Sequence, residues 1–317
     1  MKKIWTIPVL LGALLFALPS YGQYFNQQNA WRKHRHEIMF GAGVANYLGD
    51  LGGGAGAGRV WLLDLEMSQF KPAITFGYRY HLSYRMAVRA NFTYATISGS
   101  DKLTSNPERN YRNLSFTTQI YEGSLLFEYY ILRNKVGHLL HIPGAKGMAK
   151  LPIDVIVFVG AGFFYYNPKA DGTALRPLGT EGQGLPDGPE PYSPFSFSIP
   201  FGLKADYVLS QNFKVGLDLS YRFTFTDYLD DASTVYYDND VLRAEKGDAA
   251  ADLADRTDGS NPGWSAKGAP RGNPKNKDHF LTATVSLTYN FTKIRKRTKR
   301  PGGAHPFIKK RKRRMKF

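Results

Sequence analysis

The chain has no cysteine among its 317 residues. Disulfide bonds, cysteine metal ligands and a lipidated cysteine are therefore excluded, and an exported protein of this kind must be stable through hydrogen bonding and packing alone. Long apolar runs are also missing, since no later stretch reaches the roughly 18 residues that indicate a membrane-spanning helix. The mean hydropathy is −0.36. These values exclude a helical membrane protein but not a β-barrel, in which half of every strand is polar.

Enzyme motifs are absent as well. The chain has no G-x-S-x-G nucleophile elbow, no H-E-x-x-H zinc motif and no phosphate-binding loop. The seven histidines are scattered, and the spacing of His138 and His141 is not completed by a nearby carboxylate. We therefore expect no enzymatic activity, no cofactor and no metal site.

The N-terminus has the pattern of a secretory signal peptide. Lys2 and Lys3 precede an apolar stretch at 7–18, and Ser20-Tyr21-Gly22 places small residues around a cleavage position. We expect residues 1–22 to be removed on export and residues 23–35 to form a short periplasmic segment.

One segment alternates without interruption from Phe213 to Thr226. Its odd-numbered residues are all apolar, and its even-numbered residues are charged, polar or glycine. A period of two places successive side chains on opposite faces of a strand. Fourteen residues with one wholly apolar face suit a strand that has lipid on one side and a polar interior on the other.

Seven more segments carry a strand pattern. They lie at about 36–47, 73–82, 85–97, 119–132, 153–166, 195–208 and 279–291. The connections alternate between long ones (48–72, 98–118, 167–194, 228–278) and shorter ones (82–84, 133–152, 209–212). A barrel with both termini in the periplasm has long outer loops and short inner turns. We predict an all-β protein, an eight-stranded antiparallel transmembrane barrel at 36–292 that is integral to the outer membrane.

The polar strand faces carry charges that such a barrel would enclose, because eight strands leave a lumen only wide enough for side chains. Opposite charges should pair there, since an unpaired buried charge is costly. We expect a barrel-interior network of Glu37, Arg79, Arg89, Glu122, Glu128, Lys204, Asp206, Asp218 and Arg222, with Arg85 and Asp154 facing the same interior. A proton or small-ion path is the alternative.

The long loops are rich in Gly, Pro, Asp and Asn, so 187–191 and 263–274 are expected to be irregular surface segments. The last long loop begins with five aspartates: Asp227, Asp230, Asp231, Asp238 and Asp240. Their oxygens could bind calcium, although the spacing is not that of an EF-hand. The alternative is that they are solvated.

The positive charge is concentrated at the C-terminus. The net charge is +16, and residues 293–317 contain thirteen Lys or Arg and no acid. We expect a basic periplasmic tail with a candidate partner-binding run of Lys309, Lys310, Arg311, Lys312, Arg313 and Arg314. This run could bind an acidic protein surface, peptidoglycan or lipid phosphates, or it could be solvated. Nucleic acid is not an expected partner of an exported protein.

Four stretches carry a recognisable combination of motifs: Arg112–Phe116, Phe164–Ala170, Pro177–Gly184 and Thr224–Asp231. Together they resemble a family of Bacteroidota outer-membrane barrels that contains the PorG-type component of the type IX secretion system. The resemblance extends from about His36 to Phe291. Its most specific part is the loop motif that contains Asp227, Tyr228, Asp230 and Asp231, at a strand–loop junction where it could fix loop structure.

The resemblance implies a structural function. PorG-type proteins associate with the periplasmic PorK/PorN ring and tie it to the outer membrane, so the expected partners are outer-membrane lipid and ring proteins of that type. The family also contains uncharacterised paralogues. Two alternatives remain: a general surface barrel, adhesin or membrane-stabilising protein that acts through loops 168–194 and 228–278, and a small channel.

Overall fold

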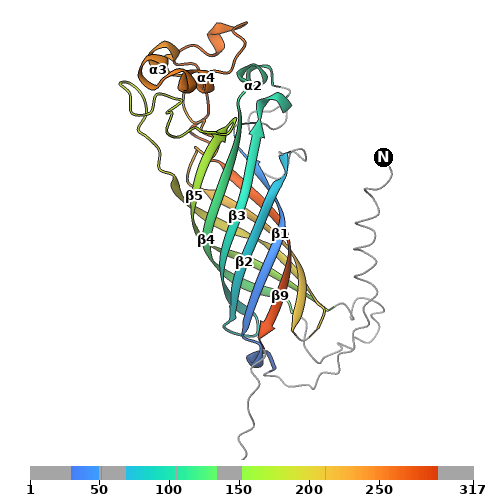
Figure 1. Cartoon of the computed structure of the whole chain (residues 1–317). Helices are drawn as coiled ribbons and strands as arrows, with labels where there is room; N and C mark the ends of the chain where they lie inside the picture. Colours follow the sequence, from blue (N-terminus) through green and yellow to red (C-terminus); the bar gives the residue numbers. More distant parts are fainter. Residues whose placement is uncertain are drawn as a thin grey trace, which may run out of the picture.

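The computed structural model describes residues 30–49, 51, 69–104, 106–133, 152–210 and 212–291. The expected signal peptide at 1–22 and the basic tail at 293–317 lie outside these residues. The described part forms one barrel with ordered loops at one end (Figure 1).

Eight long strands close into an antiparallel barrel. They are β1 (His36–Leu48), β2 (Lys71–His81), β3 (Met86–Ser100), β4 (Ser115–Leu132), β5 (Ile153–Ala170), β7 (Phe195–Val208), β8 (Phe213–Thr224) and β9 (His279–Phe291). Consecutive long strands pair with each other, β1 pairs with β9, and the short β6 (Thr173–Ala174) pairs antiparallel with the end of β5. The eight-stranded antiparallel barrel predicted from the sequence is confirmed.

The α-helices of the described residues lie at the same end of the barrel (Figure 1). The connection between β3 and β4 contains η4 (Asp101–Leu103) and α2 (Pro107–Arg112). The connection between β8 and β9 contains α3 (Asn239–Lys246), α4 (Asp248–Ala254) and η6 (Pro262–Trp264). The opposite end has the tight turn at 82–85 and η1 (Ala30–Lys33) before β1. No helix in the described residues has the length and apolar character required to cross a membrane.

The burial of β8 follows the alternation in its sequence. Phe213, Leu217, Leu219 and Phe223 are 41–48% exposed, whereas the lysine, aspartate and arginine between them are 2–7% exposed. The observed strand ends at Thr224, two residues earlier than predicted. The apolar residues therefore face outward and the charged residues face the lumen, which is the reverse of a water-soluble barrel.

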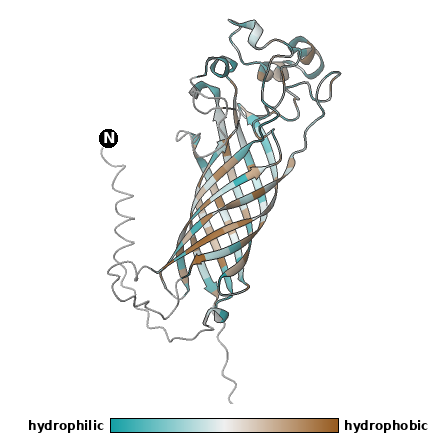
Figure 2. Cartoon of the chain, turned by 180° about the vertical axis from the view of Figure 1, so that it is seen from behind, coloured by the Kyte–Doolittle hydropathy of each residue, from teal (hydrophilic) through white to brown (hydrophobic). Residues whose placement is uncertain are grey.

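The same reversal extends around the wall. Each of the eight barrel strands carries at least one large apolar side chain that is 48% or more exposed. Examples are Phe40, Phe76, Phe92, Leu125, Val159, Phe197, Leu217 and Val285. Figure 2 shows hydrophobic residues alternating with hydrophilic ones along the strands. Because a contiguous apolar band of this size is not stable in water, the barrel is an integral membrane protein of the outer-membrane type.

Candidate functional site

The inward faces of the strands carry eleven charged side chains, all less than 10% exposed. They are Glu37, Arg79, Arg89, Glu122, Glu128, Asp154, Lys204, Asp206, Lys214, Asp218 and Arg222. The set includes all nine residues expected in the interior network. Seven of the eight barrel strands contribute to this set. Within a strand these residues alternate with outward-facing ones, because successive side chains point to opposite faces.

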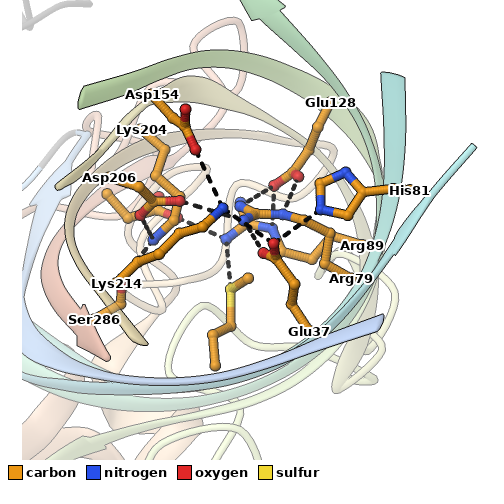
Figure 3. A network of polar contacts seen from close by, with 12 residues as sticks. Glu37, Arg79, His81, Arg89, Glu128, Asp154, Lys204, Asp206, Lys214 and Ser286 are labelled. Atoms are coloured by element: carbon orange, nitrogen blue, oxygen red, sulfur yellow. Dashed lines mark hydrogen bonds and ion pairs between the residues drawn. The ribbon is translucent and has the colours of Figure 1, made fainter. Parts of the chain in front are cut away.

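Arg79 on β2 lies at the centre of the network (Figure 3). Its Nη1 donates to Glu37 Oε2 at 2.7 Å and to Asp206 Oδ2 at 3.3 Å. Its Nη2 donates to Glu128 Oε1 at 3.1 Å, and its Nε bonds the same carboxylate. Arg79 is 0% exposed. A guanidinium suits this position because its planar fork of donors can bind several carboxylates at once.

Each carboxylate around Arg79 also has a second cation. The pairs are Glu128 Oε1 with Arg89 Nε (2.8 Å), Glu37 Oε1 with Lys214 Nζ (3.0 Å) and Asp206 Oδ1 with Lys204 Nζ (3.1 Å). Lys214 also lies 3.1 Å from Asp154, and Arg89 lies 2.7 Å from Asp218. His81 Nε2 is 2.9 Å from Glu37 Oε1. The cluster is therefore continuous across the lumen.

A second cluster lies nearer the long loops. Arg222 Nε donates to Glu122 Oε2 at 3.1 Å, and Ser198 Oγ donates to Glu122 Oε1 at 2.6 Å. Arg222 also bonds Thr282, and its Cζ lies 5.3 Å from the ring centroid of Phe280. The Phe280 ring marks the change from a charged interior to an apolar one.

Five cations face six carboxylates in this interior, and each of the eleven has an opposite charge within 4.0 Å. A permeating ion would have to separate buried pairs, and a buried charge that loses its partner is strongly destabilised. The lumen is therefore a packed ionic core, which opposes steady conduction.

The loop motif after β8 closes the mouth of the barrel. Leu229 is 0% exposed, and its backbone N donates to Asp278 Oδ2 at 2.9 Å while its carbonyl accepts from Thr118 Oγ1 at 2.6 Å. Tyr47 OH bonds Asp278 at 2.5 Å and Asp230 at 2.6 Å. The apolar cluster around this segment includes Ile97, Phe116, Ile120, Phe164, Tyr166 and Phe280. The motif thus forms a plug that is tied to several strands.

Three of the four stretches that carry the family resemblance meet at one arginine. Arg271 Nη1 lies 3.1 Å from Glu181 Oε1 and 2.5 Å from the carbonyl of Asp231. The carbonyl of Arg271 accepts from Arg112, which also forms a two-point bond with Asp101 at 2.7 and 2.9 Å. The fourth stretch joins them through Tyr166 OH, which is 2.9 Å from Thr226 Oγ1. The residues of the four stretches therefore lie together at the closed mouth of the barrel.

Burial dominates the electrostatics of the plug. It raises the pKa of Asp231 to about 6, against the opposing effects of Arg271 and of hydrogen bonds from Thr180 and Tyr192. Tyr192 OH donates to Asp231 Oδ1 at 2.5 Å, and burial raises the pKa of that phenol well above its usual range. Ionised Asp231 is therefore held at an energetic cost above pH 6.

The five loop aspartates do not gather at one place. Asp227 accepts from Ser233 Oγ at 2.6 Å, and with Asp230 and Asp231 it is buried in the plug, so the expectation of a solvated cluster is wrong for these three. Asp238 caps α3 by accepting from two backbone amides, and Asp240 is exposed on that helix. Across the described ranges, no group of three or more His, Cys, Asp or Glu residues has an arrangement that could hold a metal ion.

Arg85 does not face the interior, which corrects that expectation. It is exposed in the turn between β2 and β3, one residue before β3 begins, and its Nη1 lies 3.4 Å from Tyr129 OH on the outer wall. Arg85 shares the odd numbering of the inward-facing Arg89, but the alternation of side chains applies only within a strand and Arg85 lies in the turn.

The irregular loop segments are fixed by contacts. Gly184 N donates to the carbonyl of Pro189 at 3.0 Å, and Tyr236 N donates to the carbonyl of Ala269 at 2.9 Å. Leu242 on α3 and Ala250 on α4 pack with Leu178, Leu185 and Tyr237 in a separate small core. The long loops therefore form a cap with its own apolar centre.

Several contacts of the site have no signal in a single sequence. The strand alternation predicts that His81 and Lys214 face the lumen, but it does not predict that both contact Glu37. Glu181 and Arg271 come from different loops, 90 residues apart. Only the resemblance of Pro177–Gly184 to the barrel family pointed toward Glu181.

Comparison with protein families matches one family model to part of the chain. A family model described as "Domain of unknown function (DUF6089)" matches residues 24–167. No curated protein matches the chain.

Among solved structures, the chain is similar to Neisserial surface protein A, with 9% identity, a TM-score of 0.37 and coverage of 81% of this chain and 97% of the other. It is similar to Ail of Yersinia pestis in complex with a heparin analogue, with 9% identity, a TM-score of 0.36 and coverage of 81% and 99%. It is also similar to a major outer membrane protein from Thermus thermophilus, with 13% identity, a TM-score of 0.36 and coverage of 81% and 100%.

Proposed function

We propose that this protein is a non-enzymatic barrel component of the type IX secretion system that anchors a periplasmic ring of the PorK/PorN type to the outer membrane. The observation that carries the proposal is the meeting of three resembling stretches at Arg271. Its side chain donates to Glu181 and to the carbonyl of Asp231, and its own carbonyl accepts from Arg112. The stretches that resemble the PorG-type family thus act together in holding the mouth of the barrel closed.

The filled lumen supports an anchor over a channel. Paired charges occupy the interior, and Leu229 closes the mouth above them. A barrel without a passage can still act through its two ends, since its wall holds it in the membrane. The proposed partners are therefore outer-membrane lipid at the wall and ring proteins at the periplasmic end.

The basic tail is the proposed contact with the ring. It follows β9, whose last residue Phe291 pairs with His36 at the short-turn end of the barrel. A tail that continues from there starts on the periplasmic side if residues 1–22 direct export, as proposed. Its cationic run 309–314 would bind an acidic protein surface, and salt would weaken that contact.

Affinity purification from detergent-solubilised outer membranes tests this function. The full chain should retain ring proteins at low salt, and a chain truncated after residue 292 should retain fewer while keeping its folded-barrel mobility on a gel. If the full chain retains no periplasmic ring component, the secretion function is wrong. If truncation leaves retention unchanged, the tail is not the contact.

A second function, a surface barrel that acts through its outer loops, is favoured by one observation. The cap has its own core, in which Leu242 and Ala250 are buried, and α3 presents Val241 outward at 39% exposure. Replacing residues 239–254 by a short Gly-Ser linker should abolish surface adhesion if the cap is the functional part. Ring retention should not change under the anchor proposal.

A further inference from the structure

Basic and aromatic side chains surround the short-turn end of the barrel. Trp31 and Arg32 lie in η1, and Arg35 directly precedes β1. The Cζ atom of Arg35 lies 5.1 Å from the ring centroid of Trp31, and its Nη1 donates to Tyr80 OH at 3.2 Å. The Cζ atom of Arg32 lies 5.6 Å from the same indole. Two guanidinium groups are thus held against one aromatic ring.

The wall of β1 and β2 completes this patch. His36 Nδ1 lies 2.6 Å from Tyr78 OH, and the ring of His36 packs 5.1 Å from that of Tyr80, centroid to centroid. Tyr78 is 42% exposed on the outer face. The basic-aromatic patch therefore consists of Trp31, Arg32, Arg35, His36, Tyr78 and Tyr80.

The height of the patch matches the headgroup level of a membrane. Phe40 and Phe76 are paired neighbours on the apolar wall, with exposures of 55% and 54%. His36 and Tyr80 are paired four residues further toward the short-turn end, which is about 13 Å along the strands. Tyrosine and tryptophan rings favour this boundary because one part is apolar and the other polar.

The charge at this end has one sign. The exposed or half-exposed charged residues at the described short-turn end include Arg32, Arg35, Arg85 and Arg133. The acidic residues nearest to it, Glu37, Asp154 and Asp206, are 1%, 2% and 0% exposed and pair with lysines inside the barrel. The carboxylates at this end thus pair with lysines inside the barrel, and the arginines outside it can bind an external anion.

We infer that the basic-aromatic patch binds the headgroup of an anionic phospholipid in the periplasmic leaflet of the outer membrane. A phosphate lying between Arg32 and Arg35 would satisfy donors that have no acidic partner among the described residues, and the acyl chains would lie on the apolar wall that includes Phe40 and Phe76. A phospholipid carries both the anionic phosphate that the arginines would bind and the apolar chains that would cover the wall. A lipid fits the patch better than a protein does, because the tyrosines and Phe40 form one continuous outer face with the lipid-facing band.

The test is native mass spectrometry of the full-length protein, released from micelles that contain equal amounts of phosphatidylglycerol and phosphatidylcholine with identical acyl chains. The wild type should retain phosphatidylglycerol preferentially. In the double variant R32Q/R35Q the preference should fall at least fivefold, since one basic side chain near an anionic surface contributes about a fivefold gain in binding. The matched control K102Q/R176Q removes two exposed cations at the opposite end and should keep the wild-type preference.

Three outcomes would overturn the inference. The first is equal retention of the two lipids by the wild type, and the second is an unchanged preference in R32Q/R35Q. The third is complete displacement of phosphatidylglycerol by millimolar inorganic phosphate, which would identify an ion site and not a lipid site. If the second outcome is accompanied by loss of ring proteins from R32Q/R35Q, the patch binds a protein partner and not a lipid.

Discussion

Replacing Arg79 by methionine tests the ionic core of the barrel most sharply. The change removes the one cation that bonds three carboxylates, Glu37, Glu128 and Asp206, while it preserves most of the side-chain volume. Each carboxylate keeps one other cation, so the core loses contacts without losing every partner. Removing one member of a buried ion pair typically costs about 3–5 kcal/mol, and we expect a loss of that size in the free energy of unfolding.

A second substitution should restore part of the loss. In the double variant R79M/E128Q, Arg89 still pairs with Asp218, and Glu37 and Asp206 still pair with Lys214 and Lys204. The interior of R79M holds six carboxylates and four of its cations, whereas that of the double variant holds five and four. The excess of buried negative charge is therefore smaller, so we expect the double variant to be the more stable of the two. The exposed control R243M breaks the pairs of Arg243 with Asp248 and Asp252, both at 2.7 Å. It should lower the stability much less than R79M does, because solvent screens such exposed pairs.

Urea unfolding of the protein in lipid vesicles measures these differences, followed by tryptophan fluorescence and by the shift in gel mobility of the unfolded barrel. If R79M is no less stable than R243M, the ion pairs do not hold the barrel together. If R79M/E128Q is less stable than R79M, the loss does not arise from uncompensated charge.

Two further predictions concern the plug at the mouth. Because the folded pKa of Asp231 is about 6, above its ordinary value of 3.8, the folded cap binds a proton between those pH values that the unfolded chain does not. The plug should therefore become about 1.4 kcal/mol more stable when the pH is lowered from 7 to 5. Hydrogen exchange of residues 226–234 should show this gain in the wild type and not in D231N. An equal gain in both proteins would refute the prediction. Y47F keeps the ring packed on Phe116 but removes the hydroxyl that bonds Asp230 and Asp278. It should lower the free energy of unfolding by about 1–3 kcal/mol, since the two buried carboxylates lose the one hydrogen that the hydroxyl offers them. No change would mean that water replaces the bond.

The strand pattern carries most of the fold information. In β8 the period of two assigned Lys214, Asp218 and Arg222 to the lumen, and the structure has them there. This works because each strand has lipid on one side and a packed polar interior on the other, so a shift by one residue would expose every charge to lipid. The alternation ends with the strand, which is why Arg85 was assigned to the wrong side.

The cap is a different case. Arg271 binds Glu181 and Asp231 across loops that share no period, and Leu229 is buried although its neighbours in the sequence are aspartates and a tyrosine. Such contacts depend on how the loops fold over the barrel mouth, and local composition predicted only irregular, solvated segments. The acidic plug could be foreseen as a motif through its resemblance to other barrels, but its burial could not.

Single-channel recording in planar bilayers tests most directly whether the barrel is closed. The network around Arg79 and the plug around Leu229 predict that the reconstituted wild-type protein gives no steady current steps over a wide voltage range. Wild-type protein that is folded by the gel-mobility test and yet shows stable, reproducible open-channel steps would contradict the packed lumen and with it the assignment of function to the two ends of the barrel.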